Sequence, residues 1–178
     1  LIHYCSTELN RHVISLEDPV ENNQANLLQI QVNERAGVTY ATGLKAILRH
    51  SPDVIMIGEI RDKETAKIAI EASLTGHLVV STIHAKDSIS CLYRLMDLGV
   101  SIDELRQTII GIVAQVLFHT SALQDDRLAL YEILSDIHLN QAISAILNKG
   151  DFQLPYELTL KGQKEFVESH YAVTNIHR

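Results

Sequence analysis

Cysteines, long apolar runs and net positive charge are all scarce in this 178-residue sequence. The only two cysteines, Cys5 and Cys91, lie in unrelated segments. Two thiols cannot form a four-ligand zinc site by themselves, so we expect free thiols in a cytosolic protein. No run approaches the ~20 apolar residues that a membrane-spanning helix needs, and the amino terminus lacks a signal-peptide pattern.

The charge balance argues against a generally basic surface. The 15 Lys and Arg residues against 22 Asp and Glu residues leave a formal net charge of −7, which is not typical of a nucleic-acid-binding protein. A hydrophobic content of 46% with 21% charged residues is ordinary for a globular protein. The length suits one domain with a sizeable core, or one domain with a small appendage.

Residues 54–57 form a short, uninterrupted apolar run, and Gly58 and Glu59 follow it. Such a run predicts a strand that is buried on both faces of a parallel sheet. The carboxyl end of a strand of this kind is where open α/β sheets place their ligands. The run alone does not distinguish a binding site from a buried strand that ends in a solvated acid.

Strand and helix patterns alternate along most of the chain. The predicted strands cover residues 12–16, 27–32, 54–57, 77–84 and 127–134. The predicted helices cover residues 40–49, 63–74, 88–98, 102–117, 136–148 and 159–169. Alternation of this kind indicates a parallel sheet that is covered by helices on both faces. We therefore expect an α/β core over residues 1–135 and a small helical appendage over residues 136–178.

Acidic or imidazole side chains follow three of the predicted strands. They are Glu17, Asp18 and Glu21 after the first strand, Glu59 after the apolar run, and His84. Because the carboxyl ends of parallel strands meet at one edge of a sheet, we expect these groups to converge. Carboxylates can hold Mg²⁺ or orient a water, and a histidine can hydrogen-bond a phosphate. The combination indicates phosphoryl chemistry on a nucleotide, although the acidic turn taken alone is more typical of a solvated turn.

Three segments resemble, in order, the sequence boxes of the traffic ATPases of type II secretion, type IV pilus assembly and competence systems. Residues 13–21 resemble the aspartate box, residues 53–62 the atypical Walker B box, and residues 75–87 the histidine box. The resemblance covers roughly residues 1–135, and the lack of a zinc-binding tetracysteine makes the chain most similar to the competence branch. It implies the C-terminal part of a RecA-like P-loop NTPase domain, an α/β fold with a mostly parallel sheet.

The resemblance also implies catalytic roles for three residues. Glu17 would polarise or position the attacking water. Glu59 would act on Mg²⁺ and its water network, and is the one expected metal-binding residue. His84 would contact the γ-phosphate of ATP. The implied cofactors are therefore ATP and Mg²⁺, with no zinc.

Supporting roles follow from the same boxes. Asp18 and Glu21 would shape the acidic turn on the nucleotide side, and His77 would support the histidine box or a subunit contact. Arg61 and Asp62 are interpreted as structural, either pairing with each other or capping the next helix.

The phosphate-cradling motif of this family, Gly-x-x-x-x-Gly-Lys-Ser/Thr, does not occur in the chain. Residues 1–9 resemble the helix that follows a P-loop, so we expect the motif just before residue 1 and the chain to be a truncated or partial product. Two further departures are Lys45, where the family usually has arginine, and Val116 after Gln115, where Gln-Arg is usual.

The main hypothesis is an ATP-hydrolysing motor subunit that powers type II secretion or type IV (pseudo)pilus assembly, in competence DNA uptake. The resemblance implies a cytoplasmic homo-hexamer at the inner face of the cell membrane, an inner-membrane platform protein as partner, and no direct nucleic-acid binding. Two alternatives stay open: a non-hydrolytic interaction domain, and an inactive remnant of such an ATPase.

Overall fold

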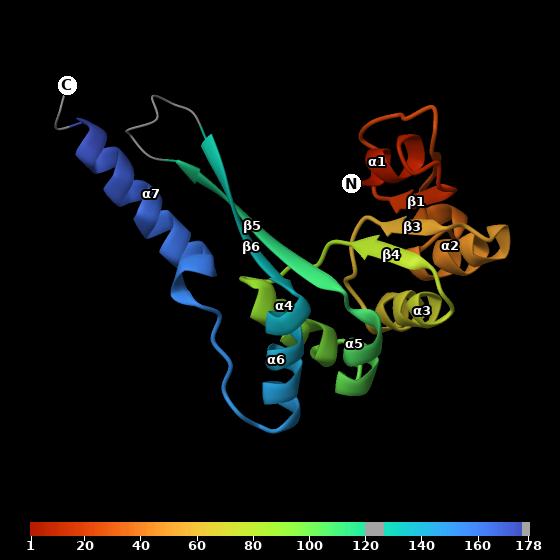
Figure 1. Ribbon diagram of the computed structural model, residues 1–178. Helices are drawn as coiled ribbons and strands as arrows, with labels where there is room; N and C mark the ends of the chain where they lie inside the picture. The colour runs from red at the N-terminus through yellow and green to blue at the C-terminus, as the bar shows by residue number, and fades with distance from the viewer. Residues whose placement is uncertain (120–126, 176–178) are drawn as a thin grey trace. The chain divides into compact units, whose positions relative to one another are not determined.

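The computed structural model describes residues 1–119 and 127–175 (Figure 1). The chain forms two compact units, which are described separately. The first comprises Leu1–His84 and Leu95–Thr108, and the second comprises Ala85–Arg94 and Ile109–Arg178. The predicted boundary between residues 1–135 and 136–178 lies at the junction of strand β6 and helix α6, and it stays a prediction.

A four-stranded parallel sheet forms the centre of the first unit. Its strands stand in the order β2-β1-β3-β4. Their bounds are Val13–Glu17 for β1, Leu28–Gln31 for β2, Val54–Ile57 for β3 and Leu78–Ser81 for β4. All three neighbouring pairs run parallel. The prediction that the apolar run is an internal strand of a parallel sheet is confirmed.

Alternating side chains of this sheet supply two packing faces. Ile14, Leu16 and Ile55 are fully buried in one core cluster, which includes residues of helices α2 (Tyr40–Ile47) and α3 (Lys63–Leu74). The intervening residues Val13 and Val54 pack with Cys5 of helix α1 (Ile2–Thr7) in a second cluster. Figure 1 shows α2 and α3 along the same side of the sheet. Period-two alternation thus places helices on both faces.

Side-chain caps mark the starts of three helices in this unit. Thr39 and Thr42 form a capping box at the start of α2, and Asp62 accepts the Thr65 N–H at 2.8 Å at the start of α3. Ser101 and Glu104 form the predicted capping box of α5 (Ile102–Thr108), with the Ser101 N–H donating to Glu104 at 2.7 Å. These caps satisfy N–H groups that have no partner inside the helix. Short 3₁₀ turns occupy Glu34–Ala36 and Leu48–His50.

The prediction that the helix beginning at residue 102 continues to residue 117 is wrong. Helix α5 ends at Thr108, and Gly111–His119 is strand β5, paired antiparallel with β6 (Arg127–Ser135). The apolar residues of this segment recur at helical spacing, but most are β-branched, and Gly111 weakens a helix. Pairing with β6, the next strand along the chain, therefore decides the conformation.

Three helices accompany the β5–β6 ribbon in the second unit. They are α4 (Ser88–Asp97), whose last turn belongs to the first unit, α6 (Asp136–Leu147) and α7 (Leu160–Asn175), with a 3₁₀ turn at Tyr156–Leu158. On β6 the residues Leu130, Glu132 and Leu134 are buried, while Tyr131 and Ile133 between them are exposed. Helix α6 confirms the prediction, and α7 runs beyond the predicted end at residue 169.

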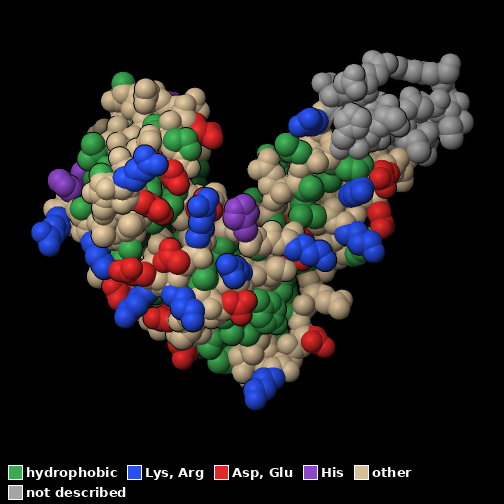
Figure 2. All heavy atoms as spheres, turned by 180° about the vertical axis from the view of Figure 1, so that it is seen from behind, with side chains coloured by type: hydrophobic (Ala, Val, Ile, Leu, Met, Phe, Trp, Pro, Cys, Tyr) green, Lys and Arg blue, Asp and Glu red, His purple; other side chains and the backbone are tan. Residues whose placement is uncertain are grey.

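The surface of the described residues carries mixed charge. On the face drawn in Figure 2, Lys and Arg side chains are interspersed with Asp and Glu side chains rather than gathered into one basic area. None of the helices in the described part of the chain combines the length and hydrophobicity that a bilayer crossing requires.

Glu132 is a buried carboxylate in the second unit, with 4% of its surface exposed. Its Oε1 accepts hydrogen bonds from the N–H (2.9 Å) and hydroxyl (2.6 Å) of Ser88, the first residue of α4. Its Oε2 accepts the N–H of Leu160, the first residue of α7, at 3.2 Å. A carboxylate in this position satisfies free N–H groups and favours the positive end of each helix dipole. Glu132 therefore ties two helices to β6.

Replacing Glu132 with glutamine should lower the free energy of unfolding by about 2 kcal/mol. The amide carries no charge, and its NH₂ group would face a group of Ser88 or Leu160 that itself donates a hydrogen bond. The measurement is urea unfolding followed by circular dichroism. The control is Glu157→Gln at an exposed residue, for which we expect a change of less than about 0.5 kcal/mol. Equal effects of the two substitutions would contradict the conclusion that Glu132 ties α4 and α7 to β6.

Candidate active site at the carboxyl edge of the parallel sheet

The register of the sheet places the candidate residues on one edge. Leu16 of β1 is opposite Ile57 of β3, and Ile57 is opposite Ser81 of β4. The residues that follow these three strands therefore leave the sheet at the same level. Glu17 is the last residue of β1, while Glu59 and His84 lie two and three residues beyond their strands.

Backbone contacts fix the turn that carries Glu59. The Gly58 N–H donates to the Leu16 carbonyl at 2.8 Å, and the Ile60 N–H donates to the Thr82 carbonyl at 2.9 Å. The Thr82 hydroxyl donates to the Gly58 carbonyl at 2.6 Å. Glu59 is thus held from both neighbouring strands, and its side-chain position follows from the sheet.

Glu59 is mostly buried, with 14% of its side chain exposed. Its Oε1 forms an ion pair with the Arg61 guanidinium, and this hydrogen bond raises the pKa of Arg61 above its ordinary value. Its Oε2 is buried and makes no hydrogen bond to any residue in the described part of the chain. His84 Nε2 lies 3.5 Å from Oε2, which is an ion pair only when the imidazole is protonated. The structure therefore brings Glu59 and His84 together.

Glu17 is oriented by two side-chain donors. Ser15, two residues earlier on the same face of β1, donates its hydroxyl to Glu17 Oε1 at 2.5 Å. Gln29 on β2 donates its Nε2 to the same oxygen at 3.0 Å. Both donors bind one oxygen, so the second oxygen of the carboxylate stays available to a ligand.

Tyr40 belongs to this edge and was not predicted from the sequence. It is the first residue of α2, and a Cβ added to Gly58 would lie 2.9 Å from its hydroxyl oxygen. Burial raises the pKa of Tyr40, the charges of Glu59 and Asp18 raise it further, and Arg61 lowers it. Tyr40 therefore stands among the acidic groups of the edge. No local pattern marks it, because its position depends on contacts between remote segments.

A hollow of about 250 Å³ opens beside Tyr40, and its lining residues do not include Glu17, Glu59 or His84. Asp18, Tyr40, Arg61 and Thr65 are among the residues that line it. Its volume lies just below the ~300–1,000 Å³ of typical ligand pockets, so these walls alone do not enclose a nucleotide.

Within the described residues, no ion pair joins Glu59 to the remaining predicted site residues. Asp18 is exposed on the rim of the hollow, and Glu21 is exposed in the loop that follows. His77 precedes β4 at the opposite, amino edge of the sheet, where its Nδ1 is 3.1 Å from the Ala72 carbonyl at the end of α3. Asp62 caps α3 as predicted, whereas Arg61 pairs with Glu59 and not with Asp62.

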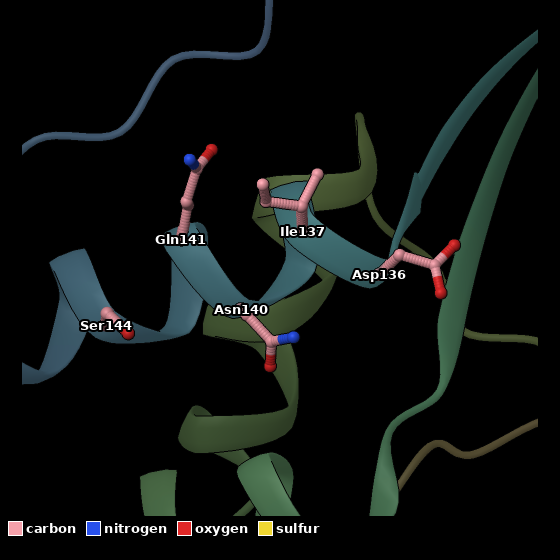
Figure 3. Close-up of a pocket in the computed structure, with 5 residues that line it drawn as sticks. All are labelled: Asp136, Ile137, Asn140, Gln141 and Ser144. Carbon is pink, nitrogen blue, oxygen red and sulfur yellow. The ribbon is translucent and has the colours of Figure 1, made fainter.

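A second hollow lies on helix α6 in the second unit (Figure 3). Its lining residues are Asp136, Ile137, Asn140, Gln141 and Ser144. All five are exposed, and only Asp136 among them is titratable. This hollow has the character of an open helix surface and holds no convergent chemical groups.

Comparison with known proteins places the chain in a family. Residues 1–142 match the family described as Type II/IV secretion system protein. The competence protein ComGA of Bacillus subtilis is 44% identical over an alignment of 191 positions, which covers 98% of this chain and 53% of that protein. The type II secretion system protein HxcR of Pseudomonas aeruginosa is 52% identical over 106 residues, 60% of this chain and 23% of that protein.

Solved structures show the same fold. The pilus retraction motor PilT with bound ADP matches with a TM-score of 0.73 and 31% identity over 83% of this chain and 46% of that chain. The ATPase DotB of Legionella pneumophila matches with a TM-score of 0.63 and 31% identity over 89% of this chain and 44% of that chain.

The sheet and its neighbours define an α/β domain of the class found in secretion and pilus ATPases. The chain belongs to the type II/IV secretion system protein family. The predicted family and the predicted α/β fold with a mostly parallel sheet are both confirmed. The chain spans about half the length of ComGA and about a quarter of HxcR.

The carboxyl edge of the sheet offers one carboxylate oxygen that could bind Mg²⁺. The described residues contain no group of three or more His, Cys, Asp and Glu side chains placed to hold a metal ion. Glu59 Oε2 is a single buried carboxylate oxygen without a hydrogen-bond partner among them. Mg²⁺ usually takes one or two carboxylates and completes its shell with waters and phosphate oxygens. Glu59 therefore fits an ion that is shared with a phosphate, and not a cage built from protein alone.

Gly58→Ala should destabilise the edge, because the new Cβ would lie 2.9 Å from the Tyr40 hydroxyl oxygen and 3.3 Å from the Leu16 carbonyl oxygen. We expect a loss of about 1–3 kcal/mol in the free energy of unfolding, measured by urea denaturation. Gly111→Ala is the control, because its nearest atom would lie 3.8 Å away. A Gly58→Ala protein as stable as the control would show that the close approach does not exist.

Proposed function

We propose that this chain carries the hydrolytic side of the ATP site in a motor subunit that powers type II secretion or type IV (pseudo)pilus assembly, in competence DNA uptake. The observation that carries the proposal is the Glu59–His84 pair at the carboxyl edge of the sheet. His84 Nε2 lies 3.5 Å from Glu59 Oε2, a buried oxygen that accepts no hydrogen bond from the described residues. Glu17 ends the neighbouring strand at the same edge.

Each side chain has a defined task in this proposal. The free oxygen of Glu17 accepts a hydrogen bond from the attacking water, while Ser15 and Gln29 hold the other oxygen. The exposed His84 ring donates a hydrogen bond to the γ-phosphate as negative charge develops there. Mg²⁺, when bound at Glu59, supplies positive charge to the phosphate oxygens.

Three other residues have supporting tasks. Asp18 and Glu21 shape the acidic turn beside the hollow, and Asp18 lies on its rim. His77 supports the histidine box from the end of α3, where its Nδ1 is also 3.2 Å from the Thr75 hydroxyl. The family's P-loop supplies the phosphate cradle, and the 178 residues contain no such motif.

The working assembly is a homo-hexamer on the cytoplasmic side of the cell membrane, acting on an inner-membrane platform protein. The relatives support this system, because ComGA is described as a competence protein and HxcR as a type II secretion system protein. PilT is described as a pilus retraction motor. A net charge of −7 and the mixed charge in Figure 2 support a role without direct contact to nucleic acid.

The test uses the whole chain, joined at residue 1 to the segment of the Bacillus subtilis relative that carries the family's P-loop. We expect this chimera to hydrolyse ATP. Glu59→Gln should lower kcat by roughly 10²–10³-fold while ATP still binds, because the charged ligand that holds Mg²⁺ beside the phosphate is lost. Phosphate release reports kcat, and a fluorescent ATP analogue reports binding.

Glu71→Gln is the matched control, because Glu71 is exposed on α3 and its ion pair with Lys67 is long, at 4.0 Å. It should leave kcat unchanged. A chimera that binds ATP without turnover would favour the non-hydrolytic interaction domain, and equal activity of Glu59→Gln and Glu71→Gln would refute the assignment of Glu59.

A further inference from the structure

The Tyr40 side chain is fixed at the site edge by its ring. The ring packs against the buried cluster that includes residues of β1, β3, α2 and α3. The Thr39–Thr42 capping box fixes the backbone immediately before it. The ring packing and the fixed backbone together hold the side chain beside Gly58 at the carboxyl edge of the sheet.

The Tyr40 hydroxyl is directed toward the residues that precede and surround Glu59. An added Cβ on Gly58 would be 2.9 Å from Oη, so the oxygen lies against the residue just before Glu59. The same side chain lines the hollow with Asp18 and Arg61. Within the part of the chain that the structure describes, Oη has no hydrogen-bond partner.

A phenol at this place has hydrogen-bonding capacity that packing does not use. Phenylalanine would fill the same space against the core, so the hydroxyl adds nothing to the burial of the ring. The hydroxyl can donate one hydrogen bond and accept another. Its electrostatic neighbours are the carboxylates of Glu59, Asp18 and Glu17, and the Arg61 guanidinium. Oη can therefore donate to a carboxylate and accept a hydrogen bond from a water at the same time.

We propose that Tyr40 is a positioning residue for the attacking water of ATP hydrolysis, with Oη accepting one hydrogen of the water while Glu17 accepts the other. This inference rests on the proposed function. Two acceptors on one water turn its lone pair toward the γ-phosphorus. The water oxygen forms a bond to phosphorus, and the bond from phosphorus to the bridging oxygen breaks with its electrons going to ADP. One water proton passes to Glu17, and the products are ADP and inorganic phosphate.

The test is Tyr40→Phe in the ATP-hydrolysing chimera that contains the full chain. We expect kcat to fall about tenfold, which corresponds to the loss of one hydrogen bond in the transition state. The KM for ATP should stay within about twofold, because the water and not the nucleotide loses a contact. The melting temperature should not change, because the ring is kept.

Tyr93→Phe is the control, because Tyr93 on α4 is 49% exposed and plays no part in the edge. An unchanged kcat for Tyr40→Phe in an active chimera overturns this inference alone. A raised KM, or a fall in kcat together with the melting temperature, assigns the hydroxyl to binding or stability and also overturns it. A wild-type chimera without turnover overturns the proposed function, and this inference with it.

Discussion

Parallel pairing in register of β1, β3 and β4 is the constraint on which the candidate site depends. Because Leu16, Ile57 and Ser81 stand opposite one another, the residues that follow the three strands leave the sheet at one level. The core of Ile14, Ile55 and neighbouring residues fixes this register, since a shift by one residue would turn each buried side chain to the other face. Packing of the core therefore determines where the candidate site residues lie at the carboxyl edge of the sheet.

Glu59 is held firmly in place, yet one of its carboxylate oxygens is left without a hydrogen bond in the described residues. One oxygen is held by Arg61, the backbone on either side is held by Leu16 and Thr82, and the second oxygen is buried without a hydrogen bond in the described residues. A buried, unsatisfied carboxylate oxygen costs folding free energy, so the arrangement is more typical of a functional site than of a structural one. Glu132 shows the contrast, because both of its oxygens accept hydrogen bonds and it serves only to join elements.

Local signals explain what the sequence could predict. Asp62 and Ser101 mark helix starts through caps whose partners lie three residues away. The uninterrupted apolar sequence of β3 is by itself enough to predict a buried strand. Strand β5 could not be predicted in this way, because its apolar spacing suits a helix, and only its tertiary pairing with β6, the next strand along the chain, decides its conformation. The same reason hides Tyr40, whose role depends on Gly58 eighteen residues later. Strand direction alone, however, predicts that Glu59 and His84 meet.

The most direct measurement of the central claim is paramagnetic broadening of histidine ring signals by Mn²⁺–ATP, with Mn²⁺ standing in for Mg²⁺ in the chimera. The account predicts strong broadening of the His84 ring, which lies beside Glu59, and weak broadening of the His77 ring, which lies at the amino edge of the same strand. Equal broadening of both rings, or broadening of His77 alone, would contradict a nucleotide site at the carboxyl edge.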